Sequence, residues 1–149
     1  MSFLSEQEIF WIKDLLKKID FLSDASEEEI SQIASSVEKK QYKPGQSIIF
    51  QGEISNRLYI INKGKVSVNI TNSREKKKVA ELSSGDYFGE ISLIEPTGAT
   101  ATLKAEEPCL IYAITSDDFK KIVENRPSIM EILKRKICQR KESLSNVKK

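Results

Sequence analysis

The sequence predicts a mainly β fold, an antiparallel sandwich or barrel with α-helices at both ends. All six glycines of the 149-residue chain lie between Gly45 and Gly98. Between them stand short runs rich in Ile, Val, Tyr and Phe, which are typical of strands joined by turns. Both flanks instead repeat apolar residues at helical spacing. With 39% hydrophobic residues, the chain is long enough for one domain with a core.

Residues 1–37 are predicted to form N-terminal helices. Ser5 and Glu8 have the spacing of a capping box, which predicts a helix over residues 5–19. The same spacing recurs at the start of a second helix over residues 26–37. The first helix also carries a broad apolar face, which must be covered by the domain itself or by another chain. This face consists of Ile9, Phe10, Trp11, Ile12, Leu15, Leu16 and Ile19.

Residues 38–114 are predicted to form the barrel. Apolar and polar side chains alternate in Lys65–Ile70, which indicates one covered face and one wet face. Asn62-Lys63-Gly64 is predicted to be a hairpin turn, and residues 72–76 a polar loop between two pairing strands. Strands are expected at residues 47–50, 57–62, 65–70, 78–82, 99–104 and 109–114.

Residues 115–149 are predicted to form C-terminal helices and a basic tail. Thr115 is the expected cap of a helix over residues 115–125, and Pro127 opens a final helix running past Ile137. The last 16 residues hold seven basic side chains against one acidic side chain. This final helix carries an apolar stripe of Ile129, Ile132, Leu133 and Ile137.

Composition argues against several functional classes. The chain has no histidine, which excludes histidine-dependent catalysis and histidine-ligated metal sites. Cys109 and Cys138 form no C-x-x-C pair, so reduced thiols are expected rather than a metal site or a disulfide. Beside the most distinctive segment of the chain, residues 88–102, the sequence has no paired carboxylates and no nucleophile motif, so an enzyme is not expected. Without a membrane-length apolar run or a signal peptide, the protein is expected to be cytoplasmic.

The segment from Phe88 to Thr102 is the part of the chain that predicts a ligand site. Gly89 permits close approach of a ligand, and the next five residues supply about one helical turn before Pro96. The start of such a helix offers free amides and a positive dipole end, which suit an anion such as phosphate. From Ala99 onward the residues alternate again, as in a strand.

This segment resembles the phosphate-binding cassette of cyclic nucleotide-binding domains, F-G-E-(L/I)-(A/S)-L-(L/I), four residues, then R-(A/S/T)-A-(S/T). Residues 88–94 match it position by position, and residues 100–102 match after the gap. The family's arginine, however, is replaced by Ala99.

Further landmarks of the family follow in order, including Lys43-Pro44-Gly45 and Gly85-Asp86, so that the resemblance extends from Phe21 to about Lys141. Within that family, the chain resembles the Crp/Fnr and protein kinase A regulatory-subunit type. The resemblance therefore implies a double-stranded β-helix, or jelly-roll, barrel. Transcription factors of this kind continue into a winged helix-turn-helix, and no DNA-binding domain is expected in a chain that stops at Lys149.

The resemblance also implies how a cyclic nucleotide would be held. Backbone amides would meet the phosphate, Glu90 would accept a hydrogen bond from the ribose, and Thr100 would offer a hydroxyl. Ala99 offers no charge, and whether Arg57 or Lys63 reaches the site cannot be read from the sequence. The implied ligand site consists of Phe88, Gly89, Glu90, Ile91, Ser92, Ala99, Thr100 and Ala101.

Three functional hypotheses remain open at this level. The favoured one is a non-catalytic regulatory domain with weak or no binding of cAMP or cGMP. The second is a genuine cyclic nucleotide sensor with an altered phosphate site. The third is a ligand-free module that uses its terminal helices to bind a protein partner or a second copy. A nucleic-acid contact through the basic tail is the least favoured binding role.

Overall fold

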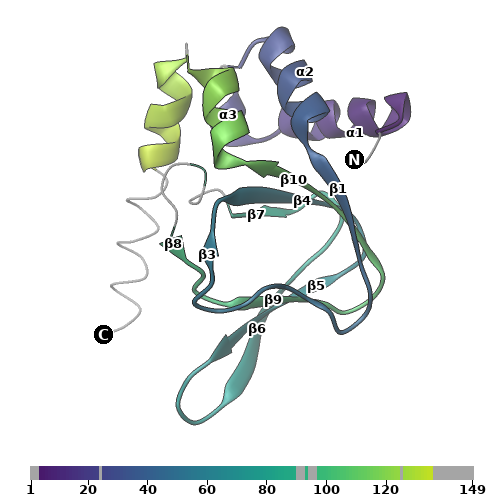
Figure 1. Ribbon diagram of the computed structural model, residues 1–149, viewed down its shortest axis with the longest axis vertical. Helices are drawn as coiled ribbons and strands as arrows, with labels where there is room; N and C mark the ends of the chain where they lie inside the picture. The colour runs from purple at the N-terminus through teal and green to yellow at the C-terminus, as the bar shows by residue number, and fades with distance from the viewer. Residues whose placement is uncertain (1–3, 24, 90–92, 94–96, 125, 136–149) are drawn as a thin grey trace.

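The computed structural model describes residues 4–23, 25–89, 93, 97–124 and 126–135. Within them, two four-stranded antiparallel sheets face each other, as Figure 1 shows. The first sheet has the order β1 (Glu38–Tyr42), β10 (Cys109–Thr115), β4 (Arg57–Lys63) and β7 (Tyr87–Phe88). The second has the order β2 (Ser47–Ile49), β9 (Thr102–Ala105), β5 (Val66–Thr71) and β6 (Lys76–Leu82). A small antiparallel pair joins β3 (Ile54–Ser55) to β8 (Thr97–Gly98).

The helices gather at one end of the molecule, beside the first sheet (Figure 1). The helices α1 (Glu6–Leu16) and α2 (Glu27–Ser36) both begin with the predicted capping boxes, at Ser5 and Ser26. Helix α1 ends three residues earlier than predicted, because the chain tightens into i to i+3 bonding at Lys18 and then forms the 3-10 turn η1 (Asp20–Leu22). Helix α3 (Ser116–Val123) starts at the predicted cap, Thr115, and residues 127–135 are helical.

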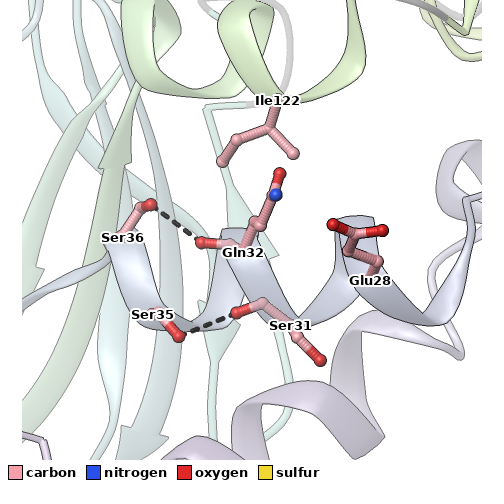
Figure 2. Close-up of a pocket in the computed structure, with 6 residues that line it drawn as sticks. All are labelled: Glu28, Ser31, Gln32, Ser35, Ser36 and Ile122. Atoms are coloured by element: carbon pink, nitrogen blue, oxygen red, sulfur yellow. Dashed lines mark hydrogen bonds between the residues drawn. The ribbon is translucent and has the colours of Figure 1, made fainter.

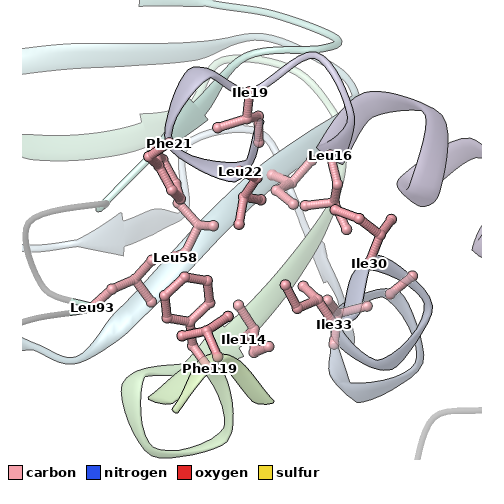
Figure 3. Packing of buried hydrophobic residues seen from close by; sticks show 14 of the residues in the cluster. Leu16, Ile19, Phe21, Leu22, Ile30, Ile33, Leu58, Leu93, Ile114 and Phe119 are labelled. Atoms are coloured by element: carbon pink, nitrogen blue, oxygen red, sulfur yellow. The ribbon is translucent and has the colours of Figure 1, made fainter. Parts of the chain in front are cut away.

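A first apolar cluster joins the helices to the outer face of the first sheet (Figure 3). Alternate residues of β4 and β10 point into it, and the apolar stripes of α1 and of residues 127–135 enter it from the other side. Both stripes therefore pack on their own domain over the described residues. Phe10 differs, because 74% of it is exposed. The cluster includes Ile12, Leu16, Phe21, Ile30, Ile33, Leu58, Ile60, Tyr112, Ile114, Phe119, Ile129 and Leu133.

A second apolar cluster fills the space between the two sheets. It takes the other alternate residues of β4 and β10, together with residues of β2, β5 and β9. Strands β4 and β10 thus bury one set of side chains under the helices and the other set in the interior. The prediction of one wet face for Lys65–Ile70 is wrong, because Ser67 and Asn69 are buried while Ile70 is 39% exposed. The two polar side chains can be buried because Asn69 donates a hydrogen bond to the Ser67 hydroxyl at 2.9 Å. This interior cluster consists of Ile48, Ile49, Tyr59, Ile61, Val66, Phe88, Ala101, Leu103, Ala105, Cys109, Ile111 and Ala113.

Two features of the strands differ from the sequence prediction. Strand β1 was not predicted, because its sequence EKKQY has no apolar alternation; it is an edge strand, paired only with β10 over the described residues. Asn62-Lys63-Gly64 is not a hairpin turn, because β4 and β5 belong to different sheets. Gly64 is required there for another reason: a Cβ atom would lie 2.6 Å from both the Cys109 Sγ and the Pro108 carbonyl oxygen.

The predicted polar loop at residues 72–76 does join a hairpin, formed by β5 and β6. The Asn72 side chain closes the loop by accepting hydrogen bonds from the Arg74 and Glu75 amides, both at 2.9 Å. This hairpin extends away from the helices at the opposite end of the molecule (Figure 1).

Candidate functional site

The first half of the cassette is anchored on β4. Phe88 ends β7 and pairs with Tyr59, and the two rings stack with centroids 4.9 Å apart and an interplanar angle of 14°. Gly89 follows with φ +91°, and a Cβ atom there would collide with the Arg57 carbonyl oxygen. Glycine is needed at this position because it allows the positive φ and the close backbone approach.

The second half of the cassette is held by the turn before β3. The Ala99 amide donates to the Glu53 carbonyl at 2.9 Å, and the Gly52 amide donates to the Ala99 carbonyl at 2.8 Å. Ala99 packs against the interior cluster and Ala101 belongs to it, whereas Thr100 is exposed. The strand predicted over residues 99–104 begins only at Thr102, but Ala101 and Leu103 both face the interior, as the predicted alternation requires. Ala99 lies on the same side of the chain, because it also packs against the interior cluster.

The middle of the cassette is described only at Leu93. Glu90, Ile91 and Ser92, which the sequence assigned to the ribose and phosphate, lie outside the described residues. Leu93 is fully buried in the cluster beneath the helices, close to Leu58 and Phe119 (Figure 3). The cassette thus contacts the interior through Phe88 and the helical layer through Leu93.

Arg57 is a charged residue that lies beside the cassette. Its neighbour Leu58 belongs to the cluster under the helices and Tyr59 to the interior cluster, so strand alternation directs the Arg57 side chain toward the interior. Its Nε atom is buried and has no hydrogen-bond partner among the described residues. The sequence could not reveal this, because a lone arginine at a strand start is usually solvated.

The pKa values of two interior tyrosines depend on the charges near this site. Burial, and then the neighbouring Tyr59, raise the pKa of Tyr42 to about 12, while the positive charge of Arg57 opposes the rise. Burial also raises the pKa of Tyr59; the hydrogen bond that Arg57 donates and the positive charge of Arg57 oppose this rise, and Glu53 adds to it. Arg57 and Glu53 are therefore both within electrostatic range of the interior hydroxyls.

A pocket of about 460 Å³ lies elsewhere, between α2 and α3 (Figure 2). Two of its three serine hydroxyls are used within α2: Ser35 donates to the Ser31 carbonyl at 2.9 Å, and Ser36 donates to the Gln32 carbonyl at 2.8 Å. Hydroxyls committed to their own helix backbone are not poised as nucleophiles. The lining residues are Glu28, Ser31, Gln32, Ser35, Ser36 and Ile122.

Within the described ranges, no three His, Cys, Asp or Glu side chains gather as they would around a metal ion. None of the helices in the same ranges has the length and apolarity that crossing a membrane requires.

Comparison with known proteins identifies the family. The family described as "Cyclic nucleotide-binding domain" matches residues 39–126, more than half of the chain. The chain therefore belongs to the cyclic nucleotide-binding domain family. A curated relative is the potassium/sodium hyperpolarization-activated cyclic nucleotide-gated channel 2 of Mus musculus, 30% identical over 118 residues, which are 79% of this chain and 13% of the channel. The chain thus spans only a small part of that relative.

Solved structures have the same fold. cAMP-bound PfPKA-R (141–441) matches with a TM-score of 0.75 and 25% identity, over 81% of this chain and 43% of that chain. The regulatory subunit of a cAMP-independent protein kinase A from Trypanosoma brucei matches with a TM-score of 0.69 and 26% identity, over 87% of this chain and 47% of that chain. The same subunit has been solved with cAMP in its A site as a triple variant, in which one substitution replaces a threonine by arginine.

Proposed function

We propose that this chain is a non-catalytic regulatory domain whose interior site binds cAMP or cGMP only weakly, because Ala99 stands where the family's cassette carries arginine. The observation that carries the proposal is the combination of a matching cassette with an uncharged residue on its interior side. Ala99 contacts the interior cluster, so an arginine there would project toward the ligand site rather than into solvent.

The missing charge has a large expected effect. Truncating one partner of a buried charge pair costs about 2–5 kcal/mol, and each 1.4 kcal/mol is about tenfold in affinity. A site of micromolar affinity would thus weaken to roughly the range from tens of micromolar to millimolar. The Trypanosoma subunit supports this reasoning, since its kinase is cAMP-independent and its cAMP-bound form carries an introduced arginine.

Regulation requires that occupancy of the site changes another surface. Leu93 supplies a candidate route, because it belongs to the cassette and packs against Leu58 and Phe119 beneath the helices (Figure 3). A movement of the cassette on binding would change this packing and therefore the position of α3. Such a response requires that the ligand bind the two arrangements with different affinities.

The test is isothermal titration with cAMP and cGMP of the wild type, of Ala99→Arg and of Ile54→Arg. The control places the same charge on β3, at a residue that is 67% exposed and outside the implied ligand site. We expect Ala99→Arg to tighten binding by roughly thirtyfold or more and Ile54→Arg to leave it unchanged. Micromolar binding by the wild type, unchanged in Ala99→Arg, would refute the proposal and favour a sensor with an altered phosphate site.

A second candidate function is protein binding through α1. Phe10 is 74% exposed on a helix whose other apolar residues are largely covered, and an exposed aromatic side chain is typical of interface anchors. The wild type and Phe10→Ser would be compared by sedimentation for self-association. A monomeric wild type at all concentrations would remove homodimerisation through this face.

A further inference from the structure

The buried Nε of Arg57 is a charged donor without an acceptor in the described structure. Buried polar groups in folded proteins are almost always paired, so an unpaired one needs a specific explanation. Arg57 also takes part in none of the ion pairs between described residues. The guanidinium does donate a hydrogen bond to the Tyr59 hydroxyl, but this contact with a neutral group leaves Nε unpaired and does not balance the charge. No salt bridge in that part of the chain explains Arg57.

Arg57 packs against the first described half of the cassette and follows closely in sequence the residue that binds the second half. Its carbonyl oxygen is the atom against which Gly89 packs, and the backbone of Glu53, four residues earlier, binds Ala99 at 2.9 Å. Its side chain shares the interior face of β4 with Tyr59, which stacks on Phe88. A cation in this position adjoins the site from the strand side, whereas the family's arginine would project from position 99.

We propose that Arg57 supplies the positive charge of a displaced anion site, which takes the phosphate of a nucleotide inside the jelly roll. This inference rests on the proposed function, since it assigns the remaining weak affinity of the same site to a named residue. Guanidinium suits the role, because its fixed fork of donors matches two phosphate oxygens and it stays charged at every physiological pH. A phosphate oxygen at Nε would satisfy the orphaned donor.

The binding test compares a ligand with and without the phosphate. Chemical-shift titrations with cAMP and with adenosine would be run on the wild type, Arg57→Met and Lys63→Met, because this method detects millimolar affinities. Lys63→Met is the matched control: it removes a positive charge from the exposed far end of the same strand. We expect the wild type and Lys63→Met to prefer cAMP by roughly ten- to a hundredfold, and Arg57→Met to lose that preference.

A stability measurement tests the same proposal without any ligand. The measurement uses a Tyr59→Phe background, because methionine at position 57 would otherwise leave the buried Tyr59 hydroxyl without its hydrogen bond from Arg57. In that background methionine fills much of the volume of arginine and leaves no buried donor unpaired, so adding Arg57→Met should raise the unfolding temperature by roughly 2–6 °C. A lower unfolding temperature would mean that Arg57 is a structural residue and would overturn the inference. An unchanged preference for cAMP in Arg57→Met, or no preference in the wild type, would overturn it equally.

The Ala99→Arg variant separates this inference from the proposed function. If Ala99→Arg gains cAMP affinity while Arg57→Met keeps the wild-type preference, the pocket is of the cyclic nucleotide type and only the role of Arg57 is wrong. If Ala99→Arg gains nothing, the proposed function itself fails.

Discussion

Glu8 anchors α1 to the first sheet, and its removal should destabilise the protein in a pH-dependent way. Its carboxylate accepts a hydrogen bond from the Tyr112 hydroxyl at 2.7 Å and pairs with the Lys39 Nζ at 3.1 Å. It also accepts from the Ser5 amide, which completes the capping box. Only 17% of the Glu8 side chain is exposed, so these contacts are shielded from solvent.

The magnitude follows from the protonation of this carboxylate. Burial raises the pKa of Glu8, but the hydrogen bonds from Tyr112 and Ser5 and the interaction with Lys39 lower it further, from 4.5 to about 2. At about 1.36 kcal/mol per unit, such a shift corresponds to about 3 kcal/mol of stability. Because the folded pKa is depressed, this stability is fully present above about pH 4.5 and is lost as the pH falls toward 2.

The assay is thermal and urea unfolding of the wild type, Glu8→Gln and Glu6→Gln at pH 7 and pH 3. Glu6 lies in the same first turn of α1 but is exposed, so its variant controls for the helix dipole. We expect Glu8→Gln to cost about 2–3 kcal/mol at pH 7, a drop of roughly 5–10 °C, and much less at pH 3. Equal losses in both variants, or a Glu8→Gln effect that does not change with pH, would refute the reasoning.

Two further predictions concern the cassette turn and the core. Gly89→Ala should destabilise the protein severely in urea unfolding, because its Cβ atom would collide with the Arg57 carbonyl oxygen. Gly85 is the control: it has a similar positive φ, but a Cβ atom there would meet no other atom, so Gly85→Ala should cost only about 1–2 kcal/mol. Similar losses in the two variants would contradict this difference. Phe119→Ala should cost about 3–5 kcal/mol, since Phe119 is fully buried beside Phe21, while Phe10→Ala should change stability by less than about 0.5 kcal/mol. A small effect of Phe119→Ala would show that the helices pack loosely on the sheet.

Local signals in the sequence were sufficient for the helix starts. Ser5 and Ser26 each pair with a glutamate three residues later, and both capping boxes form as predicted. The caps could be read from the sequence because they involve residues only a few positions apart, whose contacts do not depend on the rest of the fold. The same holds for the loop that Asn72 closes between β5 and β6.

Strand pairing could be predicted only in part. The runs rich in Ile, Val and Tyr revealed β4, β5 and β10, because these strands bury such side chains in the two apolar clusters. Strand β1 was not predicted, since an edge strand needs only backbone partners and its polar side chains give no periodic signal. The sequence also suggested a hairpin at Asn62-Lys63-Gly64, where the chain in fact crosses from one sheet to the other.

For the candidate site, the sequence by itself predicted the cassette and the replacement of the family's arginine by Ala99, because a motif and its spacing are contiguous in the chain. Only the tertiary structure decided that position 99 faces the interior while Thr100 is exposed, and that Leu93 packs beneath the helices. It alone brought Arg57 to the same site. Arg57 and Gly89 are more than 30 residues apart in the sequence and meet through the pairing of β4 with β7 and through close backbone packing. Such a contact depends on the whole fold, so no local pattern in the sequence could reveal it.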